Sequence, residues 1–204
     1  MPPFDPVEAA RYPAVIGVDE VGRGALCGPV VVAAVWFDPA TLPPSLFGAL
    51  DDSKKLRPSV RDRLAGELLA VARVRLVAAA APTIDRRGIR TMTLEAMRRA
   101  VERLGIDAPV IVDGNDAPPG ITLPLETCVK GDGRVPQIAA ASIVAKSCRD
   151  RLMVRLATRH PAYRWERNAG YGTADHLAAI ARLGATRHHR LSFAPLSQGV
   201  LDLP

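Results

Sequence analysis

Two short apolar runs of this 204-residue chain end in acidic residues. Residues 15–18 lead into Asp19 and Glu20, and residues 110–112 lead into Asp113. Apolar runs of this length predict buried strands. A carboxylate at the end of a buried strand is costly unless a cation neutralises it, and a divalent metal is a common partner. The pattern therefore predicts a sheet with an acidic metal site at the strand ends.

A glycine-flanked arginine, Gly22-Arg23-Gly24, follows the first acidic pair. Glycine lets the backbone come close to a ligand, and arginine matches the geometry of phosphate. Asp132 lies between two glycines just before a predicted long helix, where the backbone can turn toward the sheet. Four converging carboxylates suit magnesium, and two such ions would activate a water and stabilise a leaving oxygen. These residues indicate phosphodiester chemistry.

Composition adds limits to this hypothesis. The formal net charge of +6 favours a polyanionic partner, although a basic excess alone identifies no chemistry. The three cysteines show no disulfide or zinc spacing, which favours a reducing, cytoplasmic setting. The N-terminus has no signal-peptide pattern, and the longest apolar stretch is too short to span a bilayer, so no membrane association is expected.

The apolar periodicity predicts an α/β fold with a mixed central sheet, flanking helices and a helical C-terminal extension. A single domain is expected over residues 1–204, with a core at about 14–160 and a flank at 161–204. The predicted strands are 14–21 and 28–37, which form a hairpin, then 74–80, 109–113 and 121–129. The predicted helices are 59–72, one capped by Thr91 or Thr93 that ends at Gly105, 136–158 and 174–183. The apolar side of the helix at 136–158 is expected to consist of Ile138, Ala141, Ala145, Leu152 and Leu156, and its alanines and Ser142 should let its first turns lie close to the sheet.

The motifs together resemble the type 2 ribonuclease H family, in particular the bacterial ribonucleases HII. The matching segments occur in the family's order from residue 17 to residue 193, which makes the set far more specific than any one motif. They are 17–24 (GVDEVGRG) with 28–29 (GP), 52–56 (DSKKL), 112–115 (VDGN), 130–132 (KGD), 138–146 (IAAASIVAK) with 149–150 (RD), 170–173 (GYGT) with His176, and 189–193 (HRLSF).

The resemblance implies a ribonuclease H-like fold and hydrolysis of RNA in RNA/DNA hybrids. It also implies incision 5′ to a single ribonucleotide in duplex DNA, leaving 3′-hydroxyl and 5′-phosphate ends, and roles in ribonucleotide removal and RNA primer processing. Magnesium or manganese would be held by Asp19, Glu20, Asp113 and Asp132. In the family the Gly-Arg-Gly segment recognises the 2′-hydroxyl, and the tyrosine of Gly-Tyr-Gly-Thr stacks on the next deoxyribose. Those positions here are Gly22, Arg23, Gly24 and Tyr171.

Other matched residues are candidates for phosphate contacts, namely Lys54, Lys146, Arg190 and, with less support, Lys55. Ser142 and Lys146 share one helix face four residues apart, which suits a backbone-binding ridge, although Ser142 is equally compatible with packing. For Asp150, a structural salt bridge is at least as compatible with the pattern as metal contact. Cys27 is interpreted as a packing residue, and Asp5, Asp51, Asp85 and Asp116 are interpreted as ordinary turn or cap carboxylates.

Three alternatives stay open at this point. Another two-metal phosphoryl-transfer enzyme of related fold would cut all-DNA substrates without a ribonucleotide preference. A hybrid-binding protein without catalysis would leave four matched acids facing a polyanion unexplained. Ribonuclease HIII is disfavoured because about 13 residues precede the first strand, whereas that relative has an additional N-terminal domain. A monomer is expected, and no protein partner is predicted.

Overall fold

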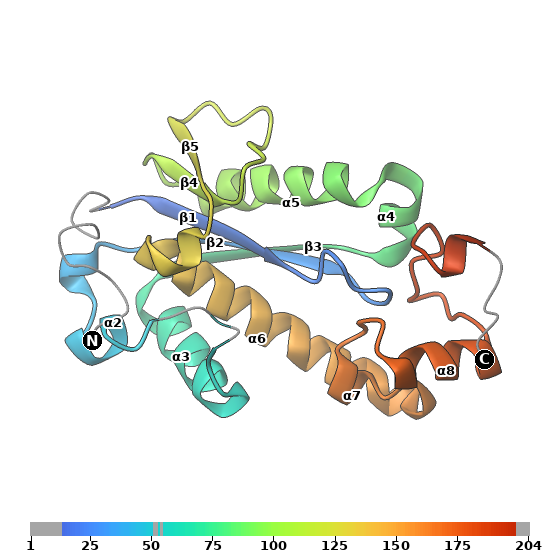
Figure 1. Cartoon of the computed structure of the whole chain (residues 1–204). Helices are drawn as coiled ribbons and strands as arrows, with labels where there is room; N and C mark the ends of the chain where they lie inside the picture. Colours follow the sequence, from blue (N-terminus) through green and yellow to red (C-terminus); the bar gives the residue numbers. More distant parts are fainter. Residues whose placement is uncertain (1–13, 51–52, 54, 199–204) are drawn as a thin grey trace.

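The computed structural model describes residues 14–50, 53 and 55–198, which form a mixed five-stranded sheet flanked by helices (Figure 1). The spatial order of the strands is β3-β2-β1-β4-β5. β2 pairs antiparallel with β1 and β3, whereas β4 pairs parallel with β1 and β5. The strands are β1 (Ile16–Val21), β2 (Val30–Trp36), β3 (Arg73–Ala79), β4 (Val110–Asp113) and β5 (Leu125–Cys128). The predicted α/β fold with a mixed sheet and an opening hairpin is confirmed.

Helices cover both faces of the sheet. The side chains of β2 alternate, so Val31 and Val35 join the apolar cluster beneath α3 and α6, while Val32 and Ala34 join the cluster beneath α5. Figure 1 shows α5 on one side of the sheet and α3 and α6 on the other. These helices are α3 (Pro58–Val71), α5 (Ile89–Leu104) and α6 (Pro136–Arg159).

The first turns of α6 lie directly on β1. A Cβ atom at Gly17 would be 2.2 Å from the carbonyl carbon of Gln137, so no larger residue fits there without moving the helix. Ala139, Ala140 and Ala141 are fully buried on the same helix. The predicted close packing of this alanine-rich stretch on the sheet is confirmed, and it brings the start of α6 to the strand ends.

The helix that follows β3 was missed by the sequence analysis, and one cap was assigned wrongly. α4 (Ala81–Arg87) follows β3 directly, and Gly88, with φ of 81°, separates it from α5. α5 begins at Ile89, not at a threonine cap. The hydroxyl of Thr93 donates to the Ile89 carbonyl inside the helix, because the apolar face already starts in the preceding turn.

Two further expectations need correction. The strand predicted over 121–129 is confined to β5, because residues 121–124 run as a loop into Pro124, whose carbonyl accepts from the Val110 amide. The apolar side predicted for α6 included Leu152, but that side chain is 36% exposed. Met153 and Ala157 are buried instead, against the C-terminal segment.

The C-terminal segment packs around the last turns of α6, where Trp165, Tyr163 and Ile180 form a separate apolar cluster with Met153. Its elements are η3 (Pro161–Tyr163), α7 (Trp165–Asn168), α8 (Ala174–Leu183) and η4 (Leu196–Gln198). The remaining short elements are η1 (Pro39–Thr41), α2 (Pro44–Phe47) and η2 (Gly131–Gly133). The helical C-terminal extension is confirmed, while the domain boundaries stay a prediction. In the described part of the chain, no helix has the length and apolar character needed to cross a membrane.

Candidate active site

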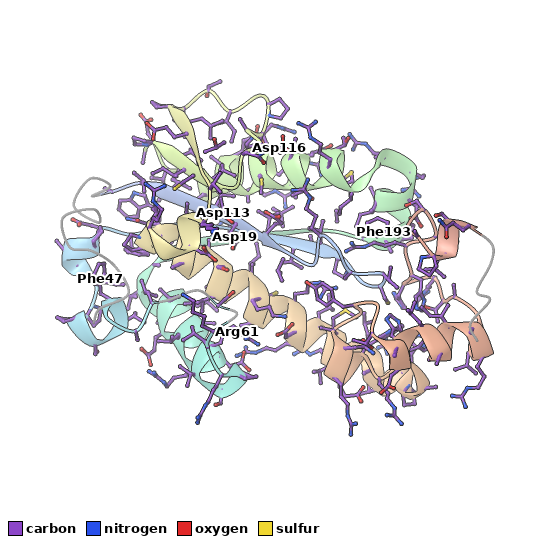
Figure 2. The ribbon with its side chains drawn as sticks, viewed as in Figure 1. Asp19, Phe47, Arg61, Asp113, Asp116 and Phe193 are labelled. Carbon is purple, nitrogen blue, oxygen red and sulfur yellow. The ribbon has the colours of Figure 1, made fainter. Side chains whose placement is uncertain are left out.

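Parallel pairing of β1 with β4 brings two predicted acids together. Val18 is in register with Val112, so Asp19 and Asp113 follow at the same end of neighbouring strands. Figure 2 shows Asp19 and Asp113 close to each other, near the start of α6. These residues are 94 positions apart in the chain, and only the crossover through β2, β3 and α5 makes them neighbours.

Asp19 is the most buried of these acids, with 6% of its surface exposed. Burial raises its pKa to about 8, and the charges of Glu20 and Asp113 act in the same direction. The Ser142 side chain and the Glu20 amide, whose nitrogen is 2.7 Å from Asp19 Oδ1, oppose this by hydrogen bonding to the carboxylate. Ionisation of Asp19 is therefore unfavourable in the protein alone, and a cation beside it would favour the charged form.

The segment before α6 contacts the strand ends. The Gly131 amide donates to Asp113 Oδ1 at 2.7 Å, which fixes that carboxylate, and Asp132 is the next residue of the chain, in η2. Lys130 adopts a left-handed conformation with φ of 56° just ahead of this turn. The predicted turn of the backbone toward the sheet is thus made by η2.

The acidic residues fit a divalent cation that needs further ligands. Hard divalent ions take oxygen ligands, and the raised pKa of Asp19 reflects a buried carboxylate that a cation would stabilise. Among the described residues, however, no three histidine, cysteine, aspartate or glutamate side chains are gathered tightly enough to form a metal cage. An ion here would need oxygens from water or substrate, as magnesium usually does.

The Gly-Arg-Gly segment forms an exposed turn beside these carboxylates. The Arg23 guanidinium lies 3.9 Å from Glu20 and 3.9 Å from Asp116, and its side chain is 45% exposed. No described atom outside the glycine's own neighbours lies within 4 Å of the position that a Cβ at Gly24 would take. A hollow of about 60 Å³, lined by Glu20, Arg23, Asp113 and Asp116 among others, opens next to this turn.

Asp116 was interpreted from the sequence as an ordinary turn residue, but it joins the site. It accepts two hydrogen bonds from Arg90 of α5, at 2.9 and 2.7 Å, and lies near Arg23. The bidentate pair ties the loop after β4 to α5. No sequence signal links residues 90 and 116, because the contact arises only when α5 packs on the sheet.

Two further candidates lie four residues apart on α6. Ser142 is buried, and its hydroxyl is 2.8 Å from that of Ser53. Lys146 Nζ is 2.8 Å from Asp150, whose other oxygen is 2.7 Å from Arg61. The salt-bridge interpretation of Asp150 is confirmed. Lys54 lies outside the described residues, and its predicted phosphate contact stays a prediction.

The C-terminal segment supplies the last two candidates. Tyr171 is partly exposed, and the Arg149 guanidinium carbon is 5.5 Å from its ring centroid. Arg190 is fully buried and donates to the carbonyls of Gly22, Arg23 and Gly28, so its guanidinium is directed into the protein. Cys27 beneath the same loop is also buried, and burial raises its thiol pKa to about 12, as expected of a packing residue.

A family profile described as Ribonuclease HII matches residues 16–196. The chain belongs to the ribonuclease HII family. Ribonuclease HII of Paramagnetospirillum magneticum is 54% identical over 188 residues, covering 92% of this chain and 93% of the relative. That of Rhodospirillum rubrum is 53% identical and covers 91% of this chain and 86% of the relative. The protein is thus a metal-dependent ribonuclease acting on RNA/DNA hybrids.

Solved ribonuclease structures share the fold of this chain. Ribonuclease H2 of Pyrococcus horikoshii OT3 aligns with a TM-score of 0.77 at 23% identity, covering 91% of this chain and 96% of that one. The structure of Bst-RNase HIII in complex with Mn²⁺ aligns with a TM-score of 0.78 at 20% identity, covering 95% of this chain and 72% of that one. The ribonuclease HII of Archaeoglobus fulgidus, solved in complex with PCNA, is 26% identical with a TM-score of 0.73 and covers 88% and 95%.

Proposed function

We propose that this protein incises 5′ to single ribonucleotides in duplex DNA as well as cutting continuous RNA in hybrids. The supporting observation is that the buried Asp19, with Glu20 and Asp113 at the same strand ends, lies beside an exposed Gly22-Arg23-Gly24 turn. The 2′-hydroxyl distinguishes RNA from DNA at one nucleotide, and a turn with open space at Gly24 allows backbone to approach it. Removal of misincorporated ribonucleotides and RNA primers would follow from that activity.

Asp19, Glu20, Asp113 and Asp132 are proposed to hold two Mg²⁺ or Mn²⁺ ions with the scissile phosphate. When bound, the ions supply a water of lowered pKa and neutralise charge on the leaving oxygen, which yields 3′-hydroxyl and 5′-phosphate ends. The chain's own part is orientation. The Gly131 amide fixes Asp113, and hydrogen bonds from Ser142 and the Glu20 amide fix Asp19.

Substrate contacts are proposed for the turn, for α6 and for the C-terminal flank at 161–204. Arg23 is exposed beside the carboxylates, and Lys146 lies on α6 one turn beyond Ser142. The partly exposed face of Tyr171 suits a sugar that lacks a 2′-hydroxyl. Lys54 is included from its motif alone, and action as a monomer without a protein partner is retained as a proposal.

The test is a DNA duplex with one ribonucleotide and a labelled strand, incubated with Mg²⁺ or Mn²⁺. We expect one cut, at the phosphodiester 5′ to the ribonucleotide, mapped at nucleotide resolution. Cutting elsewhere, or of continuous RNA only, would contradict the proposal. An all-DNA duplex cut equally well would favour the alternative two-metal nuclease without ribonucleotide selection.

Asp113→Asn is expected to bind this duplex nearly as well as the parent but to lower kcat by about 1000-fold or more, since it removes a charged ligand from the proposed metal site. Asp107→Asn, an exposed carboxylate after α5, is the matched control and should cut normally. Normal cutting by Asp113→Asn would exclude the proposed role of this carboxylate.

A further inference from the structure

Two arginines lie beneath the loop of residues 22–29, Arg149 of α6 and Arg190 of the C-terminal segment, and both have 0% of their surface exposed. A buried guanidinium usually requires a carboxylate to offset its loss of hydration. Among the described residues, neither arginine has a carboxylate within ion-pair distance, and their N–H groups donate to backbone carbonyls instead. Two buried positive charges without acidic partners lower the stability of the fold. Their hydrogen bonds to the loop's carbonyls therefore indicate that they are present to fix the loop's conformation.

Arg149 joins the loop to the segment that contains Tyr171. Its Nε donates to the Pro29 carbonyl at 2.9 Å and its Nη2 to the Cys27 carbonyl at 2.9 Å. Its Nη1 donates to the Ala169 carbonyl at 2.8 Å, and its guanidinium lies 5.5 Å from the Tyr171 ring centroid. One planar group therefore contacts both proposed substrate-recognition elements.

Arg190 holds the other end of the same loop. Its Nη2 donates to the Gly22 carbonyl at 2.7 Å, and its Nη1 donates to the Arg23 carbonyl at 2.8 Å. Its Nε and Nη2 donate to the Gly28 carbonyl at 3.1 and 3.0 Å. The carbonyls of Gly22 and Arg23 thus point toward the buried guanidinium, which fixes the conformation of the exposed turn.

The two glycines of the turn have different surroundings. Gly22 has φ of 85°, and a Cβ there would lie 2.1 Å from Arg149 Nε, so this glycine is required by the buried arginine. Gly24 has open space where its Cβ would be, so nothing in the described chain requires a glycine there. The requirement at Gly24 would come from the substrate, whereas the requirement at Gly22 comes from the support beneath the turn.

We propose that Arg149 and Arg190 are positioning residues for substrate selection: they fix the turn of residues 22–24 relative to Tyr171 and so determine which phosphodiester at a ribonucleotide junction is cut. The inference rests on the proposed junction-specific activity. A lysine should not replace either arginine, because a single ammonium cannot donate in one plane to several carbonyls as the guanidinium does.

A comparison of two substrates separates an effect on site selection from an effect on the cleavage step. In a continuous hybrid every nucleotide of the RNA strand has a 2′-hydroxyl, so a displaced turn still finds a cleavable phosphodiester. In a duplex with one ribonucleotide, a displacement of about 1 Å removes the single productive alignment and costs about 100-fold in rate. The ratio of the two kcat/KM values therefore reports positioning, and a loss of folded protein lowers both values equally.

The experiment compares the wild type with Arg190→Lys and Arg149→Lys on both duplexes, with each cut mapped. Each lysine variant is expected to lose about 30- to 100-fold in kcat/KM on the single-ribonucleotide duplex and less than about 5-fold on the continuous hybrid. The cut position should also become mixed. Thermal unfolding shows whether each variant is folded at the assay temperature.

A milder pair of variants serves if the lysine variants do not fold. The Phe193 ring centroid lies 5.1 Å from the Arg190 guanidinium carbon, so Phe193→Leu loosens the arginine without removing it. Phe47→Leu is the matched control, a partly buried phenylalanine of α2 at the opposite end of the molecule (Figure 2). Phe193→Leu should reduce the ratio about 3- to 10-fold, and Phe47→Leu should leave it unchanged.

The experiment distinguishes failure of the proposed function from failure of this inference alone. A wild type that shows no preference for the ribonucleotide would remove the proposed function and this inference with it. A wild type with that preference, combined with folded arginine variants that keep the ratio and the cut position, would overturn the inference alone. An equal loss on both substrates would do the same, because it would indicate a structural role only.

Discussion

Asp19 shows how a single residue's position is chosen for function at the expense of stability. Its carboxylate is buried next to Glu20 and Asp113, and its pKa is raised to about 8. The folded state therefore binds a proton more tightly than the unfolded state, so this group's contribution to stability is lost as pH rises from about 4 to 8. A bound cation would offset that cost.

Asp19→Asn is accordingly expected to raise the melting temperature of the metal-free protein at pH 8 by several degrees, because it removes a buried charge and its repulsion. The measurement is thermal unfolding in EDTA and again with Mg²⁺. Mg²⁺ should stabilise the wild type more than the variant. The exposed Asp107→Asn should behave as the wild type, and a lower melting temperature for Asp19→Asn in EDTA would contradict this account.

At the scale of elements, the site depends on how closely α6 approaches β1. Gly17→Ala places a methyl group against Gln137 and is expected to destabilise the fold by about 3 kcal/mol or more, because backbone must move. Gly66→Ala on α3 meets nothing within 4 Å among described residues, so it should stabilise by about 0.5 to 1 kcal/mol. Urea unfolding compares the two, and similar free energies of unfolding would refute the close-approach argument.

Strong apolar periodicity predicted most helices and strands, and the elements that were missed have weak or mixed patterns. The sequence placed α6 within one residue, since its alanines and branched residues repeat regularly. It missed α4 and α7, which have 7 and 4 residues and too few turns to show a period. Arg149 occupies the buried face of α6, and a charged residue between Ala145 and Met153 on that face was an available signal of a buried guanidinium.

At the scale of the whole molecule, a pair of buried histidines holds the C-terminal flank together, and His189 also pairs through its backbone with Cys27 of the core. His176 Nδ1 is 2.8 Å from the Tyr171 carbonyl, and its Nε2 accepts from Trp165 at 3.0 Å and lies 3.2 Å from His189 Nε2. His189 Nδ1 accepts from the Thr186 amide at 2.8 Å. This set of bonds assigns one proton to each ring, so protonating either ring breaks a bond.

Acid should therefore weaken the whole fold. Burial lowers the pKa of His189 to about 4 and also lowers that of His176, so the unfolded state binds more protons and stability falls as pH drops from about 6.5 toward 4. His189→Asn should flatten this dependence by about 2 to 3 kcal/mol between pH 7 and 4. Urea unfolding at several pH values checks the slope, and equal slopes for wild type and variant would contradict the prediction.

The sequence by itself determined the family, the mixed α/β fold and the candidate acids, because motifs and apolar periodicity are local properties of the chain. Tertiary structure decided what no local pattern contains. It placed Asp19 beside Asp113, joined Asp116 to Arg90, and directed Arg190 toward carbonyls rather than solvent. The physical reason is that burial and partnership depend on residues far apart in sequence, and these become neighbours only when the sheet and its helices pack.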